Sequence, residues 1–401
     1  AAITGTTSSN YTLSMTGAPT TTADISSRSL AVTITASNKT YNASNAATVT
    51  YADNRVAGDS LTVSGTATFS DKNIGTGKTV TANSISLSGT DAGNYTQNTT
   101  ATTTANITAR PLTVTGTFTV ANRAYDATTD ANGQVTPPVT PGLSDVQVGD
   151  DATLTGTPTF TFARATIGSS IGISTTGYSV TGADAGNYAL TQPSFSANIT
   201  ARPLTIGGAL VVSSTKTYNQ STASAITDST QLTLVNVPAG DANNATKVGL
   251  NGLSAAYSDK NVGTGKTVSV ATASLTGTTA SNYSLSLTGA PTTTADITVK
   301  SLAVTITPSN KTYDQTVTAT VSYADNRIAG DSFTVSGTAT FSDKNVGTGK
   351  TVTATGITLT GTDAANYSQN TSTTATANIT TRALAVTITA SNKTYDQTTA
   401  A

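Results

Sequence analysis

The stretch LTVSGTATFSDKNIGTGKTV, from Leu61 to Val80, decides the fold, and it returns almost unchanged as FTVSGTATFSDKNVGTGKTV from Phe333 to Val352. Apolar and polar residues alternate in its first half, which is the pattern of a half-buried β-strand. The Asp-Lys-Asn segment and the glycines after it are typical of a turn. The stretch therefore predicts strand, turn and strand, and no segment of the chain has a helical period.

Two tyrosine motifs return along the whole chain. A tyrosine in a Lys/Arg-x-Tyr-Asp/Asn context recurs with spacings of 84, 93, 95 and 82 residues, at Tyr41, Tyr125, Tyr218, Tyr313 and Tyr395. An Asn-Tyr pair recurs at Tyr11, Tyr95, Tyr188, Tyr283 and Tyr367. These spacings suit one small folding domain and are too long for one coil of a solenoid. The motifs therefore predict a tandem array of domains.

Each junction between units carries an Ile and a Leu five positions apart with one basic residue between them, and the first pair is Ile25 and Leu30. These pairs predict a partial repeat at 1–29, whole repeats at 30–111, 112–203, 204–301 and 302–383, and a partial repeat at 384–401. We therefore expect an interior segment of a longer protein. Because no Gly-Ser tract separates the repeats, we also expect a stiff rod.

The expected fold is all-β. Alternating runs and turn signals predict about six to eight short strands per repeat, folded as a small antiparallel β-sandwich of immunoglobulin-like type. Hydrophobic residues make up 36% of the chain and aromatic residues only 5%, so each core should be thin. A smaller mixed sheet crossed by a helix is the rival fold, but the sequence offers no such helix.

The composition excludes several classes of function. Because the chain has no Cys and no His, thiolate and imidazole metal sites and His-dependent catalytic triads are impossible. Its 20 basic and 21 acidic residues form no cationic stripe for nucleic acid and no basic cluster for anionic lipid. No apolar run is long enough to span a bilayer, and no signal peptide is visible. We predict a non-enzymatic segment with no catalytic, cofactor or metal residue, no nucleic-acid partner and no membrane contact.

Recurrent polar residues have two interpretations each. The motif tyrosines suit core packing with a hydroxyl bonded to backbone better than stacking on sugars. For the aspartates, turn and capping roles are favoured over calcium sites or a glycosidase pair; they recur after Gly at Asp59, Asp150, Asp241 and Asp331, and before Lys-Asn at Asp71, Asp259 and Asp343. For the motif lysines, ion pairing or a charge at a strand edge whose stem lies along apolar surface is favoured over Lys-Asn isopeptide bonds; they are Lys39, Lys216, Lys311 and Lys393, with Arg123 in the same place.

The ordered motifs resemble a known family. The best-matching positions are Tyr313 and Asp314, then Asp331, then Asp343 to Lys350 and Asp363 to Tyr367. In this order they are similar to the YDG repeat domains of large bacterial surface proteins and secreted filamentous-haemagglutinin-like adhesins. The resemblance covers essentially the whole chain and implies export to the cell surface, with no catalytic residue to carry over.

One turn departs from that family pattern. The glycine expected after Tyr-Asp is replaced by a residue with a side chain at Ala127, Gln315 and Gln397, and the aspartate is Asn42 or Asn219 in two repeats. Since residues other than glycine rarely adopt a positive φ, the sequence argues against a left-handed conformation at this turn.

We therefore predict a structural stalk segment of a bacterial extracellular fibrillar adhesin or biofilm-matrix filament. Four repeats in line would reach on the order of 150 Å. Two alternatives remain. Insertions at Asp130 to Asp151 and Ala239 to Gly252 would hold extracellular polysaccharide or another partner. Alternatively, exposed strand edges would pair with other copies of the chain in a self-assembling filament.

Overall fold

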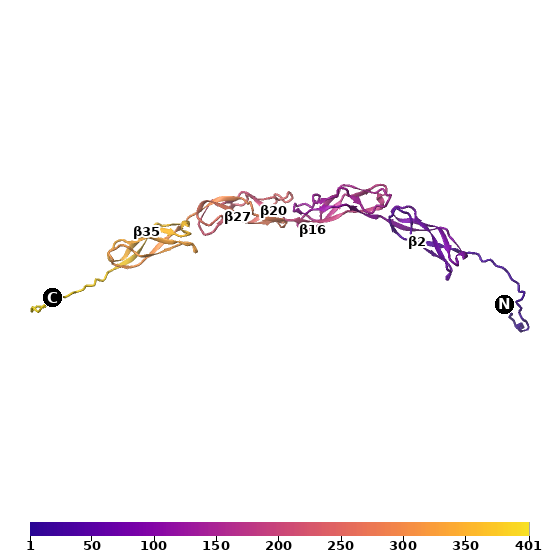
Figure 1. Cartoon of the computed structure of the whole chain (residues 1–401), viewed down its shortest axis with the longest axis horizontal. Helices are drawn as coiled ribbons and strands as arrows, with labels where there is room; N and C mark the ends of the chain where they lie inside the picture. The colour runs from indigo at the N-terminus through magenta and orange to yellow at the C-terminus, as the bar shows by residue number, and fades with distance from the viewer. Residues whose placement is uncertain (401) are drawn as a thin grey trace. The chain divides into compact units, whose positions relative to one another are not determined.

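A computed structural model describes residues 1–400, which form β-strands and five short 3-10 turns and contain no α-helix (Figure 1). The chain divides into two compact units. The first contains Ala1–Arg123, Thr129–Arg164 and Gly168–Asn198. The second begins at Ile199 and also includes two short segments of repeat 2, Ala124–Thr128 and Ala165–Ile167. Repeats 1 to 4 below are the regions 30–111, 112–203, 204–301 and 302–383.

Repeats 1 and 4 have the same element order. Repeat 1 consists of β1 (Arg28–Leu30), β2 (Val32–Ala36), β3 (Lys39–Thr40), β4 (Val49–Asp53), β5 (Thr62–Phe69), β6 (Gly75–Ser88), η2 (Ala92–Asn94), β7 (Tyr95–Gln97) and β8 (Ala101–Thr108). Repeat 4 consists of β30 (Lys300–Leu302), β31 (Val304–Pro308), β32 (Lys311–Thr312), β33 (Val321–Asp325), β34 (Thr334–Phe341), β35 (Gly347–Thr360), η5 (Ala364–Asn366), β36 (Tyr367–Gln369) and β37 (Ser372–Thr380).

Repeats 2 and 3 follow this order with extra short strands. Repeat 2 consists of β9 (Arg110–Thr115), β10 (Thr119–Val120), β11 (Arg123–Ala124), β12 (Val135–Thr136), β13 (Gly142–Leu143), β14 (Thr153–Thr155), β15 (Thr159–Phe162), β16 (Gly168–Thr176), β17 (Ser179–Thr181), η3 (Ala185–Asn187), β18 (Tyr188–Thr191) and β19 (Ser194–Thr200). Repeat 3 consists of β20 (Arg202–Gly208), β21 (Val211–Val212), β22 (Thr215–Thr217), β23 (Ala223–Ser224), β24 (Ile226–Asp228), β25 (Leu232–Val235), β26 (Gly249–Tyr257), β27 (Gly263–Thr276), η4 (Ala280–Asn282), β28 (Tyr283–Ser286) and β29 (Thr292–Thr298).

The strand pairing is mixed, which corrects the expectation of purely antiparallel sheets. In repeat 1 the main sheet has the order β3-β8-β6-β5, in which β3 and β8 are parallel and the other neighbours antiparallel. A second parallel pair joins the first strand, β1, to β7, and an antiparallel pair joins β2 to β4. Repeat 4 copies this with β32-β37-β35-β34, β30-β36 and β31-β33. Parallel pairs arise because strands far apart in the sequence close each repeat.

The opening stretch folds as predicted, into β5, a turn and β6. A β-bulge shifts the register between Ser64 and Thr66, and Gly65 lies at that point. A Cβ on Gly65 would come within 2.9 Å of the Tyr51 hydroxyl and 3.0 Å of the Asn83 carbonyl oxygen. A side chain at position 65 would therefore clash with the Tyr51 hydroxyl, so this position requires glycine.

Buried side chains form one apolar cluster in each unit. Alternate residues of the long strands point inward, for example Phe69 and Val80 in repeat 1 and Phe341 and Val352 in repeat 4. The cluster of the first unit extends from repeat 1 to Leu112, Ala152 and Tyr188 of repeat 2, and that of the second unit contains residues of repeats 3 and 4. Within a unit, consecutive repeats thus share a core.

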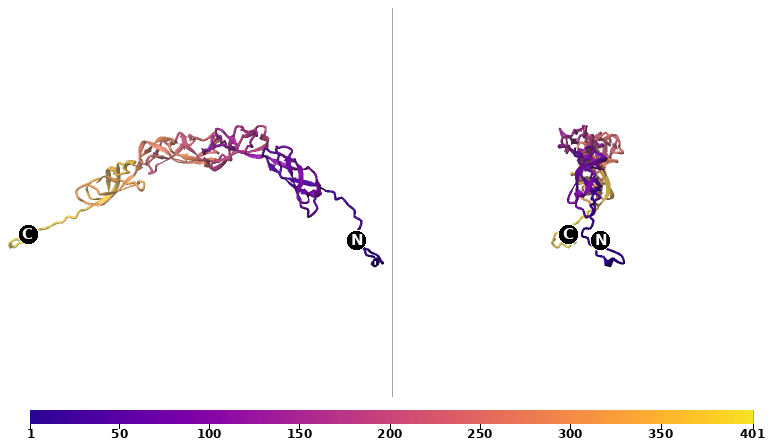
Figure 2. Two further views of the ribbon diagram at one scale, coloured as in Figure 1. Left: turned by 45° about the vertical axis from the view of Figure 1, so that its right-hand side comes forward. Right: turned by 90° about the vertical axis from the view of Figure 1, so that its right-hand side faces the viewer.

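Before β1 and after β37, the described residues form no strand (Figure 2). The segment LAVTITASNKTY occurs twice; from Leu30 it forms β2 and β3, whereas from Leu384 it is extended and exposed. The first copy pairs with β4 and β8, and no such partners exist for the second copy among residues 1–400. No helix in the described chain has the length and hydropathy to cross a membrane.

Candidate functional site

A buried aspartate joins repeats 3 and 4 within the second unit. Asp331 lies at the end of a turn of repeat 4, where its N–H donates to the Ile328 carbonyl at 3.1 Å, and its side chain is 0% exposed. Tyr367 of the same repeat donates its hydroxyl to the carboxylate at 2.5 Å, and Tyr218 of repeat 3 donates to it at 3.0 Å. The two rings meet edge to face at 5.6 Å. We call this arrangement, an aspartate with one tyrosine from each repeat, a clasp.

The turn after Tyr218 supplies a third donor. Gln220 Nε2 donates to Asp331 at 2.5 Å and to the Ala329 carbonyl at 3.1 Å. Gln220 has a φ of +63°, and the corresponding Ala43, Ala127, Gln315 and Gln397 also have positive φ. The expectation drawn from the missing glycine is therefore wrong. At Gln220 the strained backbone directs an amide across the junction, and this contact compensates for the strain.

A second contact fixes the same junction. The Asn366 side-chain oxygen accepts the backbone N–H of Val262 at 2.9 Å, and Asn366 is buried. Lys260, in the Asp-Lys-Asn turn of repeat 3, lies 3.6 Å from Asp363 and 3.9 Å from Asp331 of repeat 4. The Asn-Tyr pair thus serves the junction with both side chains.

The first unit contains the same clasp between repeats 1 and 2. Asp150 accepts the hydroxyls of Tyr41 at 2.9 Å and Tyr188 at 2.6 Å, and its side chain is 2% exposed. The Ile74 N–H donates to Asn187 at 3.0 Å. Lys72 of repeat 1 pairs with Asp184 at 2.9 Å and Asp150 at 3.3 Å. All these residues occupy the positions of their counterparts in the Asp331 clasp.

A third clasp, within the second unit, has a different cation. Asp241 accepts hydroxyls from Tyr125 at 3.0 Å and Tyr283 at 2.7 Å, and its side chain is 1% exposed. Ala165 stands where the other junctions have a lysine, and Lys247 from the insertion of repeat 3 lies 3.3 Å from the carboxylate instead. Thr279 replaces the second aspartate and donates to Asp241 at 2.8 Å.

The clasps shift the pKa of both partners. Burial raises the pKa of the tyrosines and hydrogen bonding to a carboxylate raises it further, to about 12 for Tyr125, Tyr188 and Tyr367. Burial raises the pKa of the Asp150, Asp241 and Asp331 carboxyls, but their hydrogen-bond donors and the nearby lysines outweigh burial and leave each pKa below its usual value. Each clasp is therefore a neutral tyrosine pair around an ionised aspartate across the ordinary pH range.

Repeat 1 carries half of a clasp. Asp59 accepts the hydroxyl of Tyr95, whose oxygen accepts the Val56 N–H at 2.9 Å, but no second tyrosine reaches Asp59 among residues 1–400. A cavity of about 260 Å³ lies beside them, bounded by Arg28 and Asn94. Asn94 is exposed, whereas its three counterparts in the complete clasps are buried. We call this site the open socket.

The two aspartate series have different roles. Asp71, Asp259 and Asp343 each accept the N–H of the residue two positions on at 2.8 Å, which confirms the predicted turn role. The aspartates after glycine also end turns, but three of them serve mainly as acceptors between repeats. No group of three potential metal ligands occurs within residues 1–400.

The motif lysines lie inside their own repeats. Lys39 Nζ donates to the carbonyl oxygen of Ala46 at 2.9 Å and to the side-chain oxygen of Asn42 at 3.0 Å, and it lies over the Phe69 ring at 5.4 Å. Lys311 pairs with Asp314 at 2.9 Å, which confirms the predicted ion pairing there. By these contacts each lysine stabilises the turn that follows the motif tyrosine.

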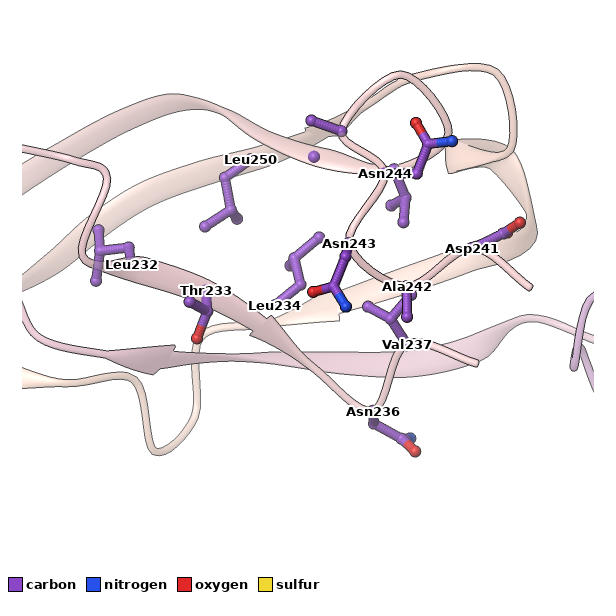
Figure 3. Close-up of a pocket in the computed structure, with 13 residues that line it drawn as sticks. Leu232, Thr233, Leu234, Asn236, Val237, Asp241, Ala242, Asn243, Asn244 and Leu250 are labelled. Carbon is purple, nitrogen blue, oxygen red and sulfur yellow. The ribbon is translucent and has the colours of Figure 1, made fainter. Parts of the chain in front are cut away.

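The insertion of repeat 3 forms a groove of about 460 Å³ (Figure 3). Leu232, Leu234 and Leu250 contribute apolar surface from β25 and β26, and Asn243 and Asn244 lie on the loop opposite. Asp241 is also part of the lining. The groove lies in one of the two insertions in which the sequence predicted contacts specific to a single repeat.

Comparison with protein families gives one result. The model of the YDG domain matches four stretches in tandem, residues 26–105, 108–195, 200–295 and 298–376. Each stretch begins just before the first strand of a repeat. No curated protein matches the chain.

Proposed function

The chain belongs to the YDG domain family, and we propose that it is a structural spacer, a stalk segment in an extracellular fibrillar adhesin or matrix filament of a bacterium. In this role the sandwich-like repeats supply length and the clasps supply stiffness. The observation that carries the proposal is that the same buried aspartate and tyrosine pair recurs at three junctions, at Asp150, Asp241 and Asp331. The same aspartate and tyrosine contacts at successive junctions favour a mechanical role, since an enzyme needs only one set of catalytic residues.

The energetics support a stiff junction. Each clasp places an ionised carboxylate out of water and satisfies it with two hydroxyl groups, one from each repeat. Separating the repeats within a unit would remove the hydroxyl that the other repeat donates, and at Asp331 also the Gln220 amide, and would expose the shared apolar cluster. Hydrogen bonds to a charged group contribute about 1.5 to 3 kcal/mol each. The junctions should therefore resist bending far more than a polar linker does.

Stiffness is the property to measure. Small-angle X-ray scattering of the whole chain should give an extended molecule with a narrow distribution of maximum dimension. A triple variant, Tyr41→Phe, Tyr125→Phe and Tyr218→Phe, should broaden that distribution while circular dichroism stays that of β-structure. The matched control is a triple variant that replaces Tyr11, Tyr51 and Tyr323 by phenylalanine. An equally broad distribution for the unmodified chain would refute the spacer role, and labelling of intact cells with an antibody tests its surface location.

The groove of repeat 3 favours a second candidate function, binding of extracellular polysaccharide. Its leucines offer a sugar apolar surface, and the exposed amides of Asn243 and Asn244 offer hydrogen-bonding groups. A glycan array with the whole chain tests this role, with Asn243→Ala and Leu234→Ser as groove variants. Binding that both variants leave unchanged would exclude the groove.

A further inference from the structure

We propose that Asn251 is a site of spontaneous covalent modification, at which the side-chain amide is lost and an aspartate or isoaspartate residue forms. The reaction needs no second protein, because the attacking group is the backbone nitrogen of Gly252. The inference rests on the geometry of β26 and goes beyond the spacer role, which concerns the junctions between repeats.

The chain contains two Asn-Gly pairs, which begin at Asn132 and Asn251. Glycine favours attack on the preceding asparagine, because it has no Cβ to obstruct the approach of its nitrogen. Both asparagines are exposed, and each lies in the insertion of its repeat. Sequence and exposure therefore do not distinguish the two pairs, but their local geometry does.

At Asn251 a β-bulge brings the reacting groups together. The register of β26 against β27 shifts between Asn251 and Ser254, so Gly252 lies outside the regular ladder. The Gly252 N–H donates to Asn251 Oδ1 at 2.8 Å, which places the amide carbon, Cγ, beside the nitrogen that attacks it. Hydroxyl groups of Thr272 and Ser274 hold the carbonyls of Gly252 and Asn251, at 3.0 and 3.1 Å, so the backbone is fixed around this contact.

At Asn132 the structure holds both ends of the side-chain amide. Asn132 Nδ2 donates to Asp130 Oδ1 at 2.7 Å, and Asn132 Oδ1 accepts the Phe160 N–H at 2.9 Å. These hydrogen bonds must break before Cγ can approach the nitrogen of Gly133. Asn132 is therefore a protected Asn-Gly pair in the same chain.

The reaction consumes water and releases ammonia. The Gly252 nitrogen loses its proton to base and forms a bond to Asn251 Cγ; the bond from Cγ to Nδ2 breaks, and Nδ2 takes a proton from water and leaves as ammonia. The product is a cyclic succinimide. Water then opens the ring: cleavage at the side-chain carbonyl gives aspartate, and cleavage at the backbone carbonyl gives isoaspartate.

The products change β26 where it borders the groove of repeat 3. Either product adds a negative charge, and isoaspartate also adds a carbon atom to the main chain. The preceding residue, Leu250, lines the groove, and the register shift of β26 begins at Asn251 itself. Chains that have reacted therefore differ from new chains at the edge of the groove, and their fraction grows with time.

Incubation of the whole chain at mildly alkaline pH, followed by proteolysis and mass spectrometry, tests the proposal. Each product is heavier than asparagine by about 1 Da, and electron-transfer fragmentation distinguishes isoaspartate from aspartate. In the folded chain Asn251 should lose its amide about ten times faster than Asn132 or more, because Asn132 must first break its hydrogen bonds. In urea the two asparagines should react at similar rates, which gives the reference for an unprotected pair.

Substitutions test the cause of the difference. Asp130→Ala removes the carboxylate that holds the Asn132 amide and should raise the rate at Asn132 toward that at Asn251. Asp228→Ala is the matched control, because Asp228 accepts the Thr230 N–H at 2.9 Å in a similar turn, and it should leave both rates unchanged. Gly252→Ala should slow the reaction at Asn251, and circular dichroism verifies that these variants keep their β-structure.

Equal rates at Asn251 and Asn132 in the folded chain would overturn the proposal. It would also be overturned by an Asn251 that reacts in urea but not in the folded chain, since the strand would then protect the bulge. A rate at Asn132 that Asp130→Ala leaves unchanged would contradict the assigned cause. None of these results bears on stiffness, so the spacer role is tested separately.

Discussion

The clasps at Asp331 and Asp241 reach the same geometry with cations of different origin. At Asp331 the nearby lysine, Lys260, comes from the preceding repeat, whereas at Asp241 it is Lys247 from the repeat that carries the aspartate. Both carboxylates accept two tyrosine hydroxyls within 3.0 Å. The tyrosine pair is thus the constant part of a junction, and the lysine is a variable part.

The difference also gives the insertion of repeat 3 a structural role. It contains both Asp241 and Lys247, and the Lys247 Nζ donates to the Gly240 carbonyl at 2.8 Å. The insertion therefore replaces a cation that repeat 2 lacks at Ala165. The longer insertion of repeat 2 likewise ends at its clasp, with Asp150. Regions that depart from the repeat thus help to build the junctions.

Alkaline pH should produce the largest effect, because it acts on both clasps at once. The pKa of a clasp tyrosine is higher in the folded chain, so its stabilisation is complete below about pH 10 and is lost as the pH rises through about 12. Each such tyrosine contributes about 2 to 3 kcal/mol. Absorbance of tyrosinate should show a late group of tyrosines titrating together with the loss of β-structure. Titration of all tyrosines near pH 10 with the fold intact would contradict this.

Acid should also destabilise the clasps, but through their aspartates, whose pKa values are lowered in the folded chain. The pKa values of Asp331 and Asp241 are depressed, so the stability they confer is present above about pH 4 and is lost as the pH falls through the lower, folded values. Thermal unfolding between pH 2 and 7 measures it. The acid transition should shift upward in pH in Tyr218→Phe, because one donor that lowers the pKa is removed.

Asp331→Ala should be the most damaging single substitution in the second unit. It leaves Tyr218, Tyr367 and Gln220 without their buried acceptor, and we expect the free energy of unfolding to fall by about 3 kcal/mol or more. Urea unfolding followed by tyrosine fluorescence gives the magnitude, and hydrogen exchange should locate the loss at the junction of repeats 3 and 4. The exposed Asp343→Ala is the control. Asp241→Ala should be as damaging if the clasps are equivalent.

Tyr218→Phe should cost about 1.5 to 2 kcal/mol, since one hydrogen bond to a charged acceptor is removed. Tyr323→Phe provides the matched control, because the buried Tyr323 hydroxyl has no hydrogen-bond partner. That control should be neutral or slightly stabilising. Equal effects of the two substitutions would show that ring packing, and not the carboxylate, holds the junction.

The lysines should have the smallest effects and should separate the two junctions. Both are about 40% exposed, so each contributes at most about 1 kcal/mol, and less at high salt. Lys260→Met should increase hydrogen exchange in both repeats that meet at Asp331. Lys247→Met should do so mainly in its own loop, and the reverse pattern would contradict the assignment of the two cations.

Much of the fold could be predicted from the sequence, because its signals are local. Alternation in Leu61 to Phe69 gave the strand, and the Asp-Lys-Asn turn was correct down to the capping role of Asp71. The parallel pairs were missed, since β1 and β7 are far apart in the sequence and the alternation within a strand does not specify its partner. The segment LAVTITASNKTY forms strands from Leu30 but not from Leu384, because a strand forms only where a neighbouring strand can pair with it.

The clasps were missed for a related reason. Seven of the ten motif tyrosines are buried as expected, whereas Tyr11 and Tyr395 are exposed and Tyr313 is half-buried. The expected backbone acceptor was wrong, because the seven buried hydroxyls donate to aspartate side chains. The Gly-Asp pairs were recognised as turns. The partnership of tyrosine and aspartate joins residues more than 100 positions apart, as in Tyr218 and Asp331. One signal was available: both motifs recur together in every whole repeat. Such joint recurrence suggests a shared site, but only the geometry shows that the two tyrosines of one clasp come from different repeats.

The short connections between repeats have a consequence for a chain under tension. β8 ends at Thr108 and β9 begins at Arg110, so a pull from repeat 2 passes directly into the axis of β8. The hydrogen bonds from β8 to β3 and β6 lie across that axis. These hydrogen bonds are therefore loaded in shear at the same time, and they cannot rupture one after another. A domain loaded in shear unfolds only at high force and in one step. Under tension the junctions should therefore separate before any repeat unfolds.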